Sequence, residues 1–501
     1  MHTEKQKKHT MFICLGGTGT QIGGTISNLY PLLKQSGIAD APYEMFILDK
    51  DASGGIYSAC VTALDRYKAY FPFLPFEPKA LKPYTLYSNV YQELQGVTEI
   101  LQNADYTVMD LIGNDSPMKE LASMCWIQEK RDESIRDGNN RDPSRGSLDA
   151  LVCLEHFESC VLFEKFKAAV DNYGETGVRA VILGGATGGM GSSLIVPLAE
   201  KIKSHFADIR IDLVILGTYF SIPQRSEQQQ GKVDDIGSTQ DSFYRVADQI
   251  KELADDLVGN ERWWVYYAAI PELDDICGEF RKNKADKRKS HLLELAAALA
   301  AFRLESLPDP GFYQTALAFD KTNPKTFINW GEIPLGNELK KPARDFMRLI
   351  SIMACQVLPS FSQAPKELEK DHYVKRYIKK PQNEMEQIEE IRDLLKKWLQ
   401  DLVPYFEFWN EIQLNTKLGD KGNRDFVKFF PLEDMEYLSG ILAFEKEALL
   451  NKMLFCQETW MDFLEDIKPD KKAIASAETS KDLLIQMIKD IYRTLTARKE
   501  D

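Results

Sequence analysis

Two glycine-rich segments of the chain have the composition and the context of phosphate-binding backbone. The first, LGGTGTQIGG (15–24), follows the apolar run MFICL, and the second, GGATGGMGSS (184–193), follows the apolar run RAVIL. Glycines let backbone N–H groups approach phosphate oxygens closely, and the positive end of a following helix favours an anion. The sequence therefore predicts two strand–loop–helix units that bind phosphate.

The two segments differ in how specific they are. The first segment alone is equally typical of dinucleotide-binding folds and of adenylating enzymes. The second places the hydroxyls of Thr187, Ser192 and Ser193 among its glycines, where they can bond phosphate or cap a helix. Two such segments in one domain are far rarer than one, and a merely flexible glycine turn would not place these hydroxyls at a helix start.

The elements that position these segments follow from the periodicity of apolar residues. Short apolar runs alternate with amphipathic segments up to about residue 305, which predicts an α/β domain with a mainly parallel sheet. The expected strands are 11–15, 43–49, 179–183, 211–220 and 263–270. The expected helices are 21–34, 149–172, 192–206, 242–257 and 290–304.

The character of the chain changes after about Leu307. A PDPG break and one strand-like run, TALAF (315–319), are followed by long charged amphipathic segments. A largely helical second domain over 306–501 is the simplest interpretation. The stretch 366–402 has helical periodicity and is expected to pair with another helix or another subunit.

Composition excludes several classes of protein. A net charge of -14 disfavours a general nucleic-acid binder, which needs a clustered positive face. The basic run 281–289 is interpreted as a solvated loop. Eight cysteines without CxxC pairs argue against zinc and disulfides, and we expect reduced, mostly buried thiols. No signal peptide or membrane span fits the sequence, which predicts a cytoplasmic protein.

At the two glycine segments the chain resembles the tubulin/FtsZ superfamily. GGTGTQIGG resembles the first nucleotide loop of tubulin, GQAGCQIGN, and GGATGGMGSSL resembles the signature GGGTGSGMGTL, found in FtsZ as GGGTGTG. The second match needs one residue fewer in this chain. The order of elements is also similar over residues 10–305, so the resemblance implies a nucleotide-binding domain there that takes GTP or GDP with Mg²⁺.

The resemblance assigns roles to the residues of both segments. It implies contacts to the α- and β-phosphates and the metal region from Gly16, Gly17, Gly19 and Gln21. It implies that the phosphate tail is wrapped by Gly184, Gly185, Ala186, Thr187 and Gly188.

Two further segments resemble functional loops of the superfamily. In LDKDAS (48–53), Asp49 and Asp51 match an acidic turn and are candidates for magnesium or ribose contacts, although Asp51 suits a helix cap nearly as well. In NNRDPSRGSLDA (139–150), Arg145, Gly146 and Ser147 match the loop that senses the γ-phosphate. A simple N-capping turn is an equal alternative for that loop.

Elsewhere the family pattern is lost. The positions of the two base-reading asparagines fall on Ile270 and Ser290, so guanine preference rests on the resemblance. Glu294, one turn after Ser290, is expected either to accept hydrogen bonds from a base or, more commonly, to face solvent. The loop after the central helix contains Asp309 and Asp320 without the family's NxD pattern, and we expect one of them to supply the acid if hydrolysis survives.

Three hypotheses follow from these observations. The first is a bacterial or phage-type tubulin-like GTPase that self-associates head to tail and forms cytoskeletal filaments. The second is a non-polymerising nucleotide-binding regulatory subunit of a multi-protein bacterial system, such as antiviral defence, which binds partner proteins through its helical domain. The third is a dinucleotide-dependent oxidoreductase that uses GxGxxxG at 17–23 and Asp49, but it leaves the second glycine segment unexplained.

Overall fold

The computed structural model describes the main elements of the chain from β1 to the C-terminal helices. The described residues are 8–39, 43–48, 59–60, 62–63, 66, 107, 109, 117–126, 128–132, 146–148, 150, 154, 157–186, 189–216, 262–269, 290–307, 311–318, 328–362, 373–379, 384–414, 427–443 and 453–498.

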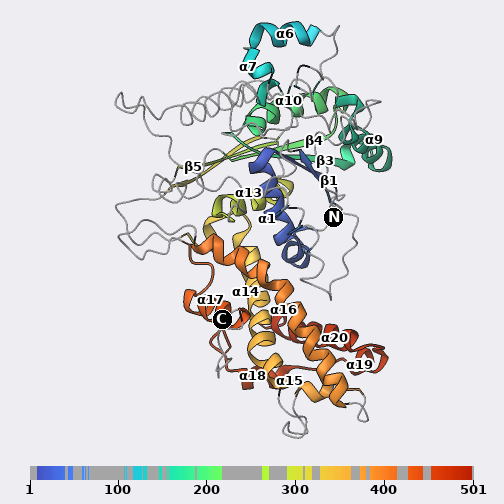
Figure 1. Cartoon of the computed structure of the whole chain (residues 1–501), viewed down its shortest axis with the longest axis vertical. Helices are drawn as coiled ribbons and strands as arrows, with labels where there is room; N and C mark the ends of the chain where they lie inside the picture. Colours follow the sequence, from blue (N-terminus) through green and yellow to red (C-terminus); the bar gives the residue numbers. More distant parts are fainter. Residues whose placement is uncertain are drawn as a thin grey trace, which may run out of the picture.

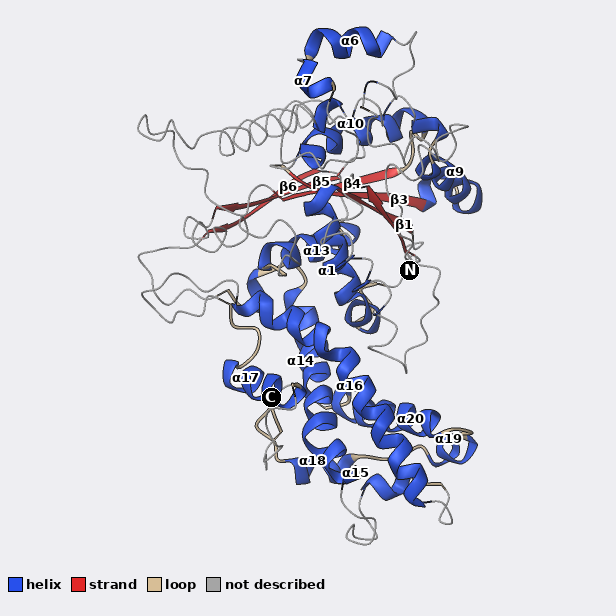
Figure 2. Cartoon of the chain, viewed as in Figure 1, coloured by secondary structure: helices blue, strands red, loops and turns tan. Residues whose placement is uncertain are grey.

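A parallel sheet of six strands forms the centre of the N-terminal part (Figure 2). Its strand order is β2-β1-β3-β4-β5-β6, and every neighbouring pair is parallel. The strands are β1 His9–Leu15, β2 Tyr43–Leu48, β3 Val178–Gly185, β4 Arg210–Leu216, β5 Arg262–Ala269 and β6 Gly311–Ala318. This confirms the prediction of an α/β domain with a parallel sheet.

Helices cover both faces of the sheet, as buried strands of a parallel sheet require. Along β1, Met11 and Ile13 pack with helices α9 (Val161–Tyr173) and α10 (Gly189–His205) on one face. Phe12 and Cys14 point to the other face, where α1 (Gly16–Gln35) and α13 (Leu292–Ser306) pack. Each strand therefore reads as a continuous apolar run, which explains why the strands were recognisable in the sequence.

The remainder of the described chain is mostly helical and lies beyond α1 and α13 (Figure 1). We call residues 328–498 the helical unit. Its helices are α14 Gly336–Ile352, a π-helical turn Met353–Val357, α15 Leu358–Ser362, α16 Glu384–Leu414, α17 Leu432–Leu442, α18 Trp460–Asp466, α19 Lys471–Ser476 and α20 Ser480–Thr496. Short helices α6 Pro117–Cys125 and α7 Gln128–Arg131 lie at the opposite end of the molecule.

Two sequence predictions about the second half of the chain need correction. The run TALAF was assigned to the second domain, but β6 pairs with β5 and extends the sheet past residue 305. The expected continuous helix over 366–402 is also different, because Tyr373–Tyr377 is a 3₁₀ turn and α16 begins only at Glu384. As predicted, α16 pairs with other helices, namely α15, α17 and α20 of the same chain.

The hydrophobic core joins the two parts of the molecule. One cluster of buried residues runs from the α1 face of the sheet through α13 and into α14, α16 and α20. Helix α13 is buried nearly all round, from Leu292 through Phe302, since it lies between the sheet and the helical unit. The helical unit therefore shares its core with the α/β domain.

Charged residues at the amino end of the sheet hold the end of α13. Arg179 and Asp212 are fully buried, with Nε of the arginine 2.5 Å from the carboxylate, and Arg210 contacts the same carboxylate at 3.0 Å. Arg179 donates to the carbonyl of Ala301 at 2.6 Å, and Arg210 donates to the carbonyl of Leu304. These contacts bind carbonyl oxygens in the last two turns of the helix. They fix the C-terminus of α13 at the amino edge and so direct its N-terminus to the carboxyl edge.

The thiols agree with the sequence analysis within the described part of the chain. Cys14, Cys60, Cys160 and Cys355 are buried and form no disulfide, whereas Cys125 is exposed and Cys456 half-buried. Burial raises the pKa of Cys60 and of Cys355 to about 12, so both are inert thiols. Among the described helices, none is long and apolar enough to cross a membrane.

We predict that Asp212→Asn destabilises the protein by about 3 kcal/mol or more, because it leaves two arginines without their shared buried counter-charge. The measurement is the midpoint of chemical denaturation. Asp208→Asn removes the same charge from an exposed residue and is the control, with an expected change within about 0.5 kcal/mol. Equal effects of the two substitutions would contradict a structural role for the buried charges.

Candidate functional site

The two glycine segments leave neighbouring strands of the sheet. Strand β1 pairs with β2 on one side and with β3 on the other, and Cys14 is in register with Leu183. Because the chain leaves β1 towards β2 and returns on the other side with β3, the carboxyl ends of β1 and β3 flank the topological switch point. Open parallel sheets bind ligands in the crevice at that point.

The first glycine segment is the first turn of α1. The helix begins at Gly16, five residues before the expected start at Gln21, and Gly16 has a φ of 61°. Neither a side-chain cap on Leu15 nor an acidic residue in the first turn is present, and the hydroxyl of Thr20 donates back to the Gly16 carbonyl at 2.8 Å. The first N–H groups of α1 thus lack an intrahelical partner and are available to an anion.

The first glycine segment packs closely on β1, on β3 and on the start of the second segment. A Cβ on Gly19 would lie 2.4 Å from the carbonyl oxygen of Leu183 and 2.9 Å from the carbonyl carbon of Cys14. A Cβ on Gly185 would lie 2.8 Å from Oγ1 of Thr18. Glycine is required at both positions because α1 starts directly against β3.

The second glycine segment continues from β3 into α10. The N–H of Ala186 donates to the carbonyl of Leu216 at 2.8 Å, and α10 begins at Gly189 rather than at the expected Ser192. Ser192 and Ser193 therefore lie inside the helix, where their hydroxyls donate to the carbonyl of Gly189 at 3.4 and 2.7 Å. They are not N-caps.

The third predicted loop also meets the second segment. Gly146 packs so closely on Gly189 that a Cβ would lie 1.9 Å from its carbonyl oxygen. Next to it, Oγ of Ser147 lies 3.4 Å from Oγ of Ser193. The structure thus brings together Gly16, Gly19, Gly185 and Gly146, which come from three distant parts of the sequence.

Gln21 adds a side chain at the start of α1. It is half-buried, and its amide oxygen is buried without a hydrogen-bond partner among the described residues. A buried acceptor of this kind costs free energy unless a donor or a cation satisfies it. This fits a residue that contacts a bound metal or its water.

The N-terminus of α13 differs from the expectation. Glu294 is only 2% exposed, and its carboxylate accepts the N–H of His291 at 3.1 Å, so it does not face solvent. Nδ1 of His291 accepts the N–H of Leu293 at 3.1 Å, which completes a capping box. The N–H of Ser290 donates to Glu411 of α16 at 2.8 Å.

His291 was missed in the sequence analysis, although the spacing HxxE before an apolar run is a capping signal. Burial lowers the pKa of His291 to about 4, so the imidazole is neutral at neutral pH. Because Nδ1 accepts a hydrogen bond, the neutral ring carries its proton on Nε2.

Seven predicted site residues lie outside the described part of the chain. They are Asp49, Asp51, Arg145, Thr187, Gly188, Asp309 and Asp320. Within the described part, no cluster of metal-ligating side chains is present.

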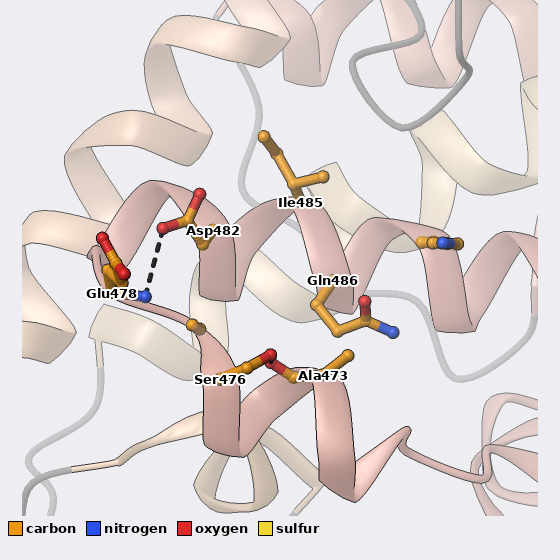
Figure 3. Close-up of a pocket in the computed structure, with 8 residues that line it drawn as sticks. Ala473, Ser476, Glu478, Asp482, Ile485 and Gln486 are labelled. Carbon is orange, nitrogen blue, oxygen red and sulfur yellow. Dashed lines mark hydrogen bonds between the residues drawn. The ribbon is translucent and has the colours of Figure 1, made fainter.

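A separate pocket lies in the helical unit, between α19 and α20 (Figure 3). It has a volume of about 540 Å³ and is lined by exposed and half-buried side chains, among them the exposed Glu478 and Asp482 and the half-buried Gln486. The carboxylate of Asp482 accepts the N–H groups of Glu478 and Thr479 at the start of α20. This carboxylate caps a helix, and none of the residues that line the pocket comes from a glycine segment.

No protein-family model matches the chain, and no curated protein matches its sequence.

We predict that Gly19→Ala destabilises the protein by about 1–3 kcal/mol, because its methyl group would collide with backbone atoms of two strands. Gly24→Ala in the same helix is the matched control, since its Cβ would make only ordinary contacts with Cys60 at 3.5 Å or more. We expect Gly24→Ala to be neutral or stabilising by about 0.4–1 kcal/mol. Equal thermal midpoints for the two variants would refute the close contact between α1 and β3.

A second prediction concerns acid. The pKa of His291 in the folded state is below its value of about 6.5 in the unfolded chain, so the unfolded state binds the proton first. Its contribution to stability is therefore complete above pH 6.5 and is lost as the pH falls towards 4. Between pH 6.5 and 5, the free energy of unfolding of the wild type should fall by up to about 1.4 kcal/mol per pH unit because of this group. His291→Asn keeps a capping residue that does not titrate, so this fall should be smaller in the variant. A steep slope retained in His291→Asn would contradict the assignment.

Proposed function

We propose that this chain is a tubulin/FtsZ-like protein that binds GTP or GDP with Mg²⁺ at the carboxyl edge of its sheet. The observation that carries the proposal is the contact between the two glycine segments. Two helices that start with glycines and carry no acidic residue in their first turns begin beside each other, at the ends of neighbouring parallel strands. Their positive ends meet at the switch point, which favours a polyphosphate.

The chain's own groups suit distinct parts of such a ligand. Backbone N–H groups at Gly16, Gly17 and Gly19 would bind the α- and β-phosphates. The buried amide oxygen of Gln21, which accepts no hydrogen bond from the described residues, would bind the cation or a water molecule of its shell. Gly184, Gly185 and Ala186, with Thr187 and Gly188, would wrap the phosphate tail. Gly146 and Ser147, with Arg145, would lie against the terminal phosphate. Magnesium, when bound, would neutralise phosphate charge, with Asp49 and Asp51 as its proposed carboxylate ligands.

Guanine is proposed from the resemblance alone. Ser290 stands at the position of a base-reading asparagine, at the carboxyl edge where α13 begins. Glu294 follows one turn later, and one oxygen of its carboxylate caps α13.

Head-to-tail self-association is the proposed form of assembly. Helix α13 spans the sheet, with its N-terminus at the carboxyl edge and its C-terminus held at the amino edge by Arg179 and Arg210. Asp309 and Asp320 follow that C-terminus in the sequence. A subunit stacked on its neighbour would bring this end of α13 towards the neighbour's nucleotide, where one of the two aspartates would act as the acid in GTP hydrolysis.

One observation favours the regulatory subunit as a second candidate function. Within the described residues, those after β6 contain no strand, and the helical unit shares its core with α1 and α13. A helical unit fused to the nucleotide domain in this way suits the binding of partner proteins. Sedimentation with a slowly hydrolysed GTP analogue separates the two functions, because only the first predicts assembly.

We predict that Gln21→Ala weakens nucleotide binding about ten- to hundredfold in Mg²⁺ and much less in EDTA, since one contact to a charged group is worth about 1.5–3 kcal/mol. Titration of fluorescent GTP, with ATP and NAD as competitors, measures both affinities. Asn28→Ala is the control, because Asn28 lies on the same half-buried face of α1 two turns further on. Equal losses with and without Mg²⁺ would give Gln21 a structural role only, and displacement by NAD alone would favour an oxidoreductase.

A further inference from the structure

Helix α1 belongs to both parts of the molecule. Its first turn, at Gly16, forms the proposed phosphate site, and its 20 residues extend about 30 Å from there. Leu29, Leu32 and Leu33 in its second half lie in the same hydrophobic cluster as the buried faces of α14 and α20. The two ends of one helix therefore serve two different parts of the chain.

A polar contact ties the far end of α1 to the helical unit. The hydroxyl of Tyr492, on α20, donates to the side-chain oxygen of Gln35 in the last turn of α1. Tyr492 is only 4% exposed, and α20 packs on α14, which also contacts α1. A change in the position or order of α1 is therefore felt directly by α20.

The first half of α1 is weak as a helix. Five of its first nine residues are glycines, at 16, 17, 19, 23 and 24, and each glycine costs about 1 kcal/mol relative to alanine in a helix interior. No side chain caps its N-terminus, and its first turn has no acidic residue. A bound phosphate would supply the missing hydrogen-bond acceptors and negative charge.

We infer that the helical unit senses nucleotide through α1: phosphate at Gly16–Gly19 orders the helix, and the Gln35–Tyr492 contact passes that order to α20. The inference rests on the proposed function. When one ligand has already ordered α1 and α20, a second ligand loses less conformational entropy on binding. The coupling between the two ligands is therefore reciprocal. A protein partner docked on the helical unit would then change nucleotide affinity, and the nucleotide would change affinity for that partner.

Hydrogen–deuterium exchange of the full chain, with and without saturating GTP and Mg²⁺, tests this coupling. In wild type we expect GTP to slow exchange in α1 and, by about fivefold or more, in α20. Tyr492→Phe removes only the hydroxyl. In this variant we expect GTP still to protect α1, but to slow exchange in α20 by less than about twofold. Such a reduction from fivefold matches the loss of one neutral hydrogen bond.

Tyr377→Phe is the matched control. The hydroxyl of Tyr377 donates to Asp490 at 3.1 Å, within the helical unit. This variant should lose some stability and still show the full response of α20 to GTP.

The outcomes separate the coupling from the site itself. Protection of α1 without any response of α20 in wild type overturns the coupling and leaves nucleotide binding intact. An unchanged response of α20 in Tyr492→Phe, or an equal loss in Tyr377→Phe, overturns the role of the Gln35–Tyr492 contact. Absence of any GTP binding by calorimetry, with α1 unprotected, overturns the proposed function and the coupling together.

Discussion

The structure depends on a close backbone contact between two helix starts at the centre of a parallel sheet. Helix α1 begins so near to β3 that Gly19 and Gly185 have no room for a side chain. The same closeness places two positive helix ends beside each other, an arrangement that repels itself unless an anion lies between them. Glycine at these positions lets the two elements pack closely. The same packing brings two positive helix ends together, and the negative charge of a nucleotide phosphate would offset their repulsion.

The rest of the fold keeps this contact in place. On one face of the sheet α1 is held by α13, which the buried pair Arg179 and Asp212 anchors at the amino edge. On the other face, Gly146 packs against the start of α10 at Gly189. Since the core beneath α1 continues into the helical unit, disturbance of that unit also disturbs the proposed site.

Much of the architecture could be predicted from the sequence, because strands that are buried on both faces consist of nearly continuous runs of apolar residues. Five strands were located to within a few residues over their described parts, and the two glycine segments were placed at the strand ends. The helix starts at Gly16 and Gly189 were missed because glycine is read locally as loop, whereas tertiary packing here forces it into a helix. The capping role of Glu294 was missed for a different reason: its partner His291 signals a cap less often than serine or threonine does.

The most direct test of the account is a crystal structure of the chain with Mg²⁺ and a slowly hydrolysed GTP analogue. We expect phosphate density at the carboxyl ends of β1 and β3, with phosphate oxygens about 2.7–3.2 Å from the backbone nitrogens of the first turn of α1. Nucleotide bound elsewhere, for example between α19 and α20, or a first turn of α1 that makes no contact with phosphate, would contradict it.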